Sequence, residues 1–136
     1  MSRFPLAAAC LAASAIALSG CGESHDFKTD RPILKLRLDE YRILPQNITA
    51  RPGRIKLVVR NDGRLPHNLA IQVPPATVRD KYEEVPGGRV ESMQPGESAD
   101  PIKVVLAPGT YRIVCTIANH DDLGQYGELT IEGPPL

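Results

Sequence analysis

Short apolar runs separated by turn-forming residues recur along most of the chain. Residues 33–38 alternate apolar and basic side chains, and residues 55–59 form a β-branched run. The pairs Pro52-Gly53 and Pro108-Gly109 and the triplet Asn61-Asp-Gly63 mark turns between such runs. Because apolar and polar residues alternate in a half-buried strand, about seven or eight such strands predict an all-β fold, a Greek-key sandwich or barrel.

One segment is expected to lie outside the sheets. Residues 74–100 are rich in proline, glycine and charged residues, and we expect an excursion there, with a short helical stretch at residues 77–84. The strands themselves are expected at residues 33–38, 41–44, 47–50, 55–59, 67–73, 102–106, 111–115 and 126–131.

The beginning of the chain has the pattern of an export signal. Residues 1–20 carry an early arginine and then an apolar run, which is shorter than the roughly 20 residues that a membrane-spanning helix needs. Residues 18–21, Leu-Ser-Gly-Cys, resemble the lipobox of bacterial lipoproteins, and this resemblance implies acylation of Cys21. We therefore expect a signal peptide at 1–20, a lipidated tether at 21–31 and one folded domain at 32–133, anchored to the extracytoplasmic face of a bacterial membrane.

The composition gives no sign of a nucleic-acid partner and leaves one thiol in the expected domain. Lysine plus arginine equals aspartate plus glutamate at 16 each, and the chain has no tryptophan, so neither a basic surface nor a stacking platform for nucleic acid is expected. Of the three cysteines, Cys10 would leave with the signal peptide and Cys21 would carry lipid. Cys115 is then the only thiol of the domain, in a compartment that oxidises thiols.

Cys115 and two histidines form a candidate metal-binding set. His67 begins one predicted strand, Cys115 ends another, and His120 follows Cys115 by five residues in the loop before the last strand. The remaining histidine, His25, lies in the tether. A thiolate and two imidazoles with a weak fourth ligand form the trigonal arrangement typical of blue copper. The sequence therefore predicts one copper ion, provided that folding brings His67 to the other two residues.

The same residues lie in segments that resemble the cupredoxins, the plastocyanin- and azurin-like blue-copper proteins. Residues 115–127 have the family's cysteine, a histidine five residues later and an axial position five later again, with glycines nearby. Residues 107–115 resemble the strand with Pro-Gly-x-Tyr that leads into the cysteine, and Pro66-His67-Asn68 resembles the first histidine with its asparagine. The resemblance covers most of the expected domain and implies a cupredoxin-like β-sandwich.

Departures from the family pattern carry further expectations. The resemblance implies that Gln125 is the axial ligand where the family usually has methionine, and its harder oxygen should favour Cu(II). Ala118-Asn119 replace the usual Pro-Gly before His120. The resemblance also implies that Asn68 ties the first histidine's segment to the cysteine loop, and such contacts hold metal ligands in place. No motif directs Met93 toward copper, so packing or surface exposure is expected for it.

The predicted function is that of a membrane-anchored type 1 copper protein, not an enzyme, which carries single electrons between redox partners in the cell envelope as a monomer. One alternative is an extracytoplasmic copper carrier or storage protein, although such a protein would gain from a more open site. Another is a cysteine nucleophile activated by histidine, for which no third orienting residue is evident. Zinc prefers four strong ligands, and Gln125 is a poor fourth. The pair Asp121-Asp122 is more typical of a solvated loop than of acid–base catalysis.

Overall fold

A computed structural model describes residues 26–134, and within that range ten β-strands form two sheets. The predicted signal peptide, the lipidated Cys21 and His25 lie outside the described residues and stay predictions. Between residues 26 and 134, no helix is long and apolar enough to cross a membrane.

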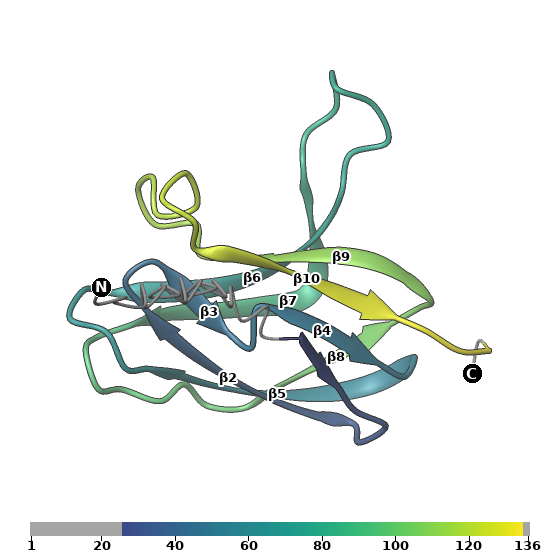
Figure 1. The fold of residues 1–136 in the computed structure, drawn as a ribbon, viewed down its shortest axis with the longest axis horizontal. Helices are drawn as coiled ribbons and strands as arrows, with labels where there is room; N and C mark the ends of the chain where they lie inside the picture. The colour runs from purple at the N-terminus through teal and green to yellow at the C-terminus, as the bar shows by residue number, and fades with distance from the viewer. Residues whose placement is uncertain (1–25, 135–136) are drawn as a thin grey trace, which may run out of the picture.

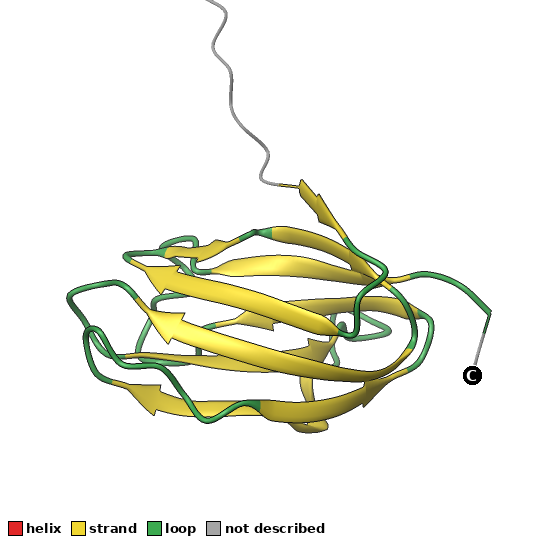
Figure 2. Cartoon of the chain, turned by 90° about the horizontal axis from the view of Figure 1, so that it is seen from below, coloured by secondary structure: helices red, strands yellow, loops and turns green. Residues whose placement is uncertain are grey.

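The two sheets lie face to face as a sandwich, which confirms the predicted all-β fold class (Figures 1 and 2). Across the larger sheet, the strands follow the order β1 (Asp26–Lys28), β4 (Asn47–Ala50), β10 (Tyr126–Ile131), β9 (Gly109–Val114), β6 (His67–Val73) and β7 (Glu83–Met93). Across the smaller sheet, the order is β3 (Arg42–Leu44), β2 (Ile33–Asp39), β5 (Gly53–Asn61) and β8 (Ile102–Leu106). The sequence pattern does not predict β1 or β7.

Alternation along the strands explains how the two sheets share one core. In β2, Leu34, Leu36 and Leu38 are buried, whereas the side chains between them are exposed. β5 follows the same rule, and the buried side chains of both sheets form a single cluster. Because successive side chains of a strand point to opposite faces, the basic residues at alternate positions keep the outer face in water.

The excursion predicted at residues 74–100 is wrong for residues 83–93. These form β7, an 11-residue strand that pairs antiparallel with β6 in an irregular register. Along β7 only Gly88, Val90 and Met93 are buried, so the strand lacks the regular alternation of buried and exposed residues that β2 and β5 show. The helical stretch expected at residues 77–84 is also wrong, because residues 74–82 have no regular structure and lie in the connection that projects from the sandwich (Figure 1).

The position of β9 brings distant parts of the chain together. β9 lies between β6 and β10 and runs antiparallel to both. Val114, at the end of β9, pairs with Ala70 in β6 and with Tyr126 at the start of β10. The end of β9 therefore lies beside the beginning of β6, and the β9–β10 loop closes over the same end of the sandwich.

Gly127 permits a close approach between β4 and β10 near this end. A Cβ atom at Gly127 would lie 2.0 Å from the carbonyl oxygen of Gln46. That oxygen accepts a hydrogen bond from the N–H of Glu128 at 3.0 Å. Since the obstacle is backbone, a side chain at Gly127 would force the two strands apart.

Candidate metal centre

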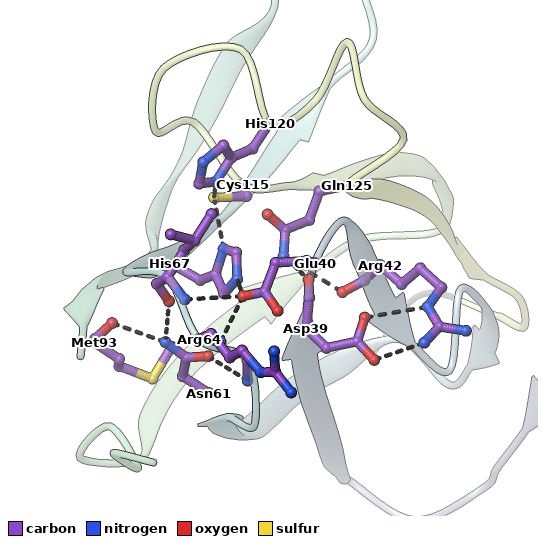
Figure 3. Close-up of polar contacts among 12 residues, drawn as sticks. Asp39, Glu40, Arg42, Asn61, Arg64, His67, Met93, Cys115, His120 and Gln125 are labelled. Carbon is purple, nitrogen blue, oxygen red and sulfur yellow. Dashed lines mark hydrogen bonds and ion pairs between the residues drawn. The ribbon is translucent and has the colours of Figure 1, made fainter. Parts of the chain in front are cut away.

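Three buried donors converge where β6 begins and β9 ends (Figure 3). The Cys115 sulfur lies 3.6 Å from Nδ1 of His120 and 4.0 Å from Nδ1 of His67. One donor atom from each residue lies within 4.8 Å of the others, and the two imidazole rings meet edge to face with their centroids 5.1 Å apart. His67 and Cys115 are fully buried, and His120 is 8% exposed. Folding thus gathers the three residues that the sequence singles out into a group that could hold a metal ion.

Backbone hydrogen bonds shape the loop that carries His120. The N–H of Cys115 donates to the carbonyl of Gln125 at 3.0 Å, and the N–H of Gln125 donates to the carbonyl of His120 at 3.0 Å. Ala118 has a φ of 48°, a left-handed conformation that glycine adopts most readily. Ala118 stands at the proline position of the family pattern and has a φ that proline cannot adopt, so this loop turns differently, and His120 still faces Cys115.

Gln125 is fully buried beside the three donors. Its Nε2 donates to the carbonyl oxygens of Asp39 at 2.7 Å and of Arg42 at 3.4 Å. Its Oε1 is buried and has no hydrogen-bond partner among the described residues. Figure 3 shows this oxygen on the side of the amide that faces Cys115 and His67. A buried acceptor without a partner costs about 1–3 kcal/mol, and a bound cation would satisfy it.

Glu40, in the turn between β2 and β3, touches the donor group although no sequence motif marks it. Its Oε1 lies 3.2 Å from Nε2 of His67 and accepts the N–H groups of Arg64 at 2.6 Å and Leu65 at 2.9 Å. The Leu65 N–H is the main reason that the pKa of the Glu40 carboxyl lies below its ordinary value, although desolvation opposes the shift. Sequence reasoning misses Glu40 because the contact joins two turns that only the folded chain brings together.

Asn68 connects the beginning of β6 to the segment that follows Cys115. Its Nδ2 donates to Oγ1 of Thr116 at 2.9 Å, and its Oδ1 accepts the N–H of Thr116 at 2.7 Å. This geometry matches the connection that the resemblance implies, and it ties together the backbone segments that carry His67 and Cys115.

The other residues considered in the sequence lie around the donor group. Met93 is buried in the hydrophobic core and pairs with His67 across β6 and β7, so it packs as expected. Asp121 forms an ion pair with Arg112 at 3.3 Å, and Asp122 is exposed. The aspartate pair therefore belongs to the outer side of the β9–β10 loop.

Comparison with known proteins gives evidence from structure alone. No protein-family model matches the chain, and no curated protein has a detectably similar sequence. A dithionite-reduced auracyanin from Roseiflexus castenholzii has a TM-score of 0.63 at 21% identity, covering 77% of this chain and 100% of that one. Auracyanin B has a TM-score of 0.62 at 17% identity, covering 74% and 88%. Auracyanin A from Chloroflexus aurantiacus, described as a blue copper protein, has a TM-score of 0.59 at 15% identity, covering 74% and 98%. The domain has a cupredoxin-like fold.

The cupredoxin-like domain places its donor group at one end of the sandwich, on the segments where the sequence resemblance was found. Asn68 joins two of those segments, so replacing it should lower the stability of the protein even without a metal. We predict that Asn68→Ala lowers the free energy of unfolding of the metal-free protein by about 1–3 kcal/mol, because it removes two hydrogen bonds to Thr116, each worth about 0.5–1.5 kcal/mol.

Chemical denaturation measures this loss. The control is Asn119→Ala, which changes an exposed asparagine of the same loop and should alter stability by less than about 0.5 kcal/mol. If the two variants were equally stable, the hydrogen bonds between Asn68 and Thr116 would make no contribution to the stability of the protein.

Proposed function

We propose that the domain binds one copper ion through His67, Cys115 and His120, with Oε1 of Gln125 as a weak fourth ligand, and carries single electrons as a type 1 copper protein. One observation carries the proposal: a thiol and two imidazoles are buried with a donor atom from each within 4.8 Å of the others. Two imidazoles, a thiolate and a weak axial glutamine form a donor set of blue copper.

The chemistry of the donors supports a redox role. Bound copper would supply a one-electron couple between Cu(II) and Cu(I). The soft sulfur of Cys115 suits Cu(I), the imidazoles suit both states, and the harder oxygen of Gln125 suits Cu(II). Because the loop hydrogen bonds and Asn68 hold the donors in place and burial excludes water, little rearrangement would accompany a change of charge. An electron carrier needs this property.

The burial of the donors favours electron transfer over the alternatives. A protein that delivers its copper gains from ligands that solvent and an acceptor can reach, whereas His67 and Cys115 are 0% exposed and His120 is 8% exposed. A nucleophilic cysteine must also reach its substrate, and reactive cysteines are partly exposed. The likeness in fold to auracyanin A, described as a blue copper protein, supports the same choice.

The first residues of the chain support a proposal that the domain is anchored to a membrane. The lipobox-like residues 18–21 support acylation of Cys21. Because Asp26–Lys28 form β1 and pair with β4, the tether would be shorter than the predicted residues 21–31 and would lie between Cys21 and β1. We propose a monomer at the extracytoplasmic face of a bacterial membrane, which exchanges electrons with redox proteins in or near that membrane. Acyl chains give stable anchoring when two are present.

Copper loading tests the proposed function. We expect the purified protein to take up one equivalent of Cu(II), to develop an intense visible thiolate-to-copper band, and to lose that band reversibly on reduction. Cys115→Ser should abolish the band, whereas Asp122→Asn, an exposed change on the same loop as His120, should leave it. A colourless protein that hands copper to a chelator would indicate copper carriage instead.

The axial role of Gln125 predicts a change in reduction potential. Gln125→Met replaces a hard oxygen with a soft thioether, so the potential measured by voltammetry should rise, by about 59 mV for each tenfold change in the ratio of Cu(II) to Cu(I) affinity. The variant also removes the donor to Asp39 and Arg42, so thermal unfolding must show that it remains folded. An unchanged or lower potential in a folded variant would refute the axial role.

The anchor predicts a change in cell fraction. In a bacterial host that processes lipoproteins, the wild-type protein should remain with the membrane fraction and show acylation of Cys21 by mass spectrometry. Cys21→Ser should move the protein to the soluble exported fraction, because the acyl chains supply the membrane affinity. Membrane retention of Cys21→Ser protein that mass spectrometry shows to have lost residues 1–20 would contradict lipid anchoring.

A further inference from the structure

One turn of the smaller sheet contacts three residues of the proposed metal centre, all of which come from the larger sheet or its loops. The turn spans residues 39–42, between β2 and β3. Oε1 of Glu40 lies 3.2 Å from Nε2 of His67, and the ring of Tyr41 meets the ring of His120 with 5.2 Å between centroids. The carbonyl oxygens of residues 39 and 42 accept hydrogen bonds from Nε2 of Gln125.

The carboxylate of Glu40 is held in place by the neighbouring β5–β6 loop. Its Oε1 accepts the N–H groups of Arg64 at 2.6 Å and Leu65 at 2.9 Å. The side chain of Asn61, which is fully buried, shapes this loop: its Nδ2 donates to the carbonyl of Leu65 at 2.8 Å and its Oδ1 accepts the N–H of Gly63 at 2.8 Å. The contact between Glu40 and His67 is therefore supported by further hydrogen bonds of the β5–β6 loop, and Figure 3 shows Glu40 together with Asn61, Arg64 and His67.

Gly63 leaves the space in which this contact forms. A Cβ atom at Gly63 would lie 2.4 Å from Oε1 of Glu40 and 2.9 Å from Nε2 of His67. The nearest obstacle is the end of the Glu40 side chain, which can move away only by giving up its hydrogen bonds to Arg64 and Leu65. The buried ring of His67 would have to shift as well. An alanine at Gly63 should therefore break the contact between Glu40 and His67 by displacing both side chains, whereas no backbone atom is among its three nearest obstacles.

The chemistry of the contact determines the proton position on His67. An ionised carboxylate only accepts hydrogen bonds, so Nε2 of His67 must carry the proton that points to Glu40. Nδ1, which faces the Cys115 sulfur at 4.0 Å, is then the nitrogen with a free lone pair. In metal sites, a carboxylate on the second ring nitrogen fixes the tautomer and orientation of a ligating histidine and raises its basicity.

We infer that Glu40 is a positioning residue of the metal centre, which holds His67 in the Nε2–H tautomer with Nδ1 directed at the metal and whose negative charge favours Cu(II) over Cu(I). This inference rests on the proposed function in its second part, the preference for Cu(II). Its first part, the tautomer of His67, concerns the metal-free protein as well.

Three variants separate the effects of shape and charge. Glu40→Gln keeps an oxygen that can accept the same N–H groups but removes the negative charge. Glu40→Ala removes both, and Gly63→Ala displaces the carboxylate while leaving it in the protein. Asp122→Asn is the matched control, since it removes one negative charge from an exposed position near the site, where solvent screens it.

The first readout is the nitrogen NMR spectrum of the metal-free protein at about pH 8, where a histidine is ordinarily neutral. We expect the Nε2–H tautomer of His67 in the wild type, in Glu40→Gln and in Asp122→Asn. Glu40→Ala and Gly63→Ala should show a mixture of tautomers. Thermal unfolding of each variant checks that it is folded, and Glu40→Gln and Gly63→Ala serve if Glu40→Ala does not fold.

The second readout is copper itself, with Cu(II) affinity from competition with a chelator and the potential from voltammetry. Glu40→Gln should bind Cu(II) about tenfold more weakly, with less change for Cu(I), and Glu40→Ala should lose about 10- to 100-fold. A tenfold change in Cu(II) affinity alone corresponds to a rise of about 59 mV in potential. Asp122→Asn should change either quantity much less.

The two readouts fail in different ways. If the wild type formed no copper spectrum, the proposed function would be overturned, while the His67 tautomer would still decide the positioning role. If Glu40→Ala and Gly63→Ala kept the wild-type tautomer, the positioning role would be overturned. If the wild type bound copper but Glu40→Gln and Asp122→Asn shifted the potential equally, the preference for Cu(II) would not come from the contact with His67.

Discussion

The pairing of β9 with an antiparallel strand on each side is the constraint on which the rest of the structure depends. It places the end of β9 beside the start of β6, so that His67 and Cys115, 48 positions apart, come within 4.0 Å. The same pairing makes the β9–β10 loop turn back over this end of the sandwich, so that His120 and Gln125 lie beside Cys115. A one-residue slip in this pairing would turn the donors to opposite faces of the sheet. The register in which β9 pairs with β6 and β10 therefore also determines where the metal-binding donor atoms lie.

The donor group also depends on the packing of the two sheets. The three strong donors belong to the larger sheet and its loops, whereas Glu40 and the carbonyl oxygens that hold Gln125 belong to a turn of the smaller one. These contacts therefore depend on how the two sheets pack against each other. Any ligand that binds the folded arrangement and not the unfolded chain will stabilise the sandwich as a whole.

The sequence predicts the parts of this molecule in which one local rule dominates. β2 and β5 can be predicted because burial of one face requires alternation. His67, Cys115 and His120 can be predicted because the chain has only three cysteines and three histidines, and few of them lie in the domain. Glu40 is one of 16 acidic residues, and its role depends on a contact across 27 positions that no local pattern encodes. Gly63 has the pattern of a turn glycine, yet its distinguishing property is the space it leaves for two side chains.

The irregular composition of β7 has a consequence for how the molecules behave toward one another. β7 is one of the two edge strands of the larger sheet, and an edge strand offers backbone donors and acceptors to any second chain. Here Glu83, Glu84, Arg89 and Glu91 carry charges along that edge, with an ion pair between Arg89 and Glu84. Pro86 interrupts the row of N–H groups. Pairing of two copies through β7 would bring these charges together and leave hydrogen bonds unmade, so a strand that the sequence pattern does not reveal also disfavours growth of the sheet at this edge.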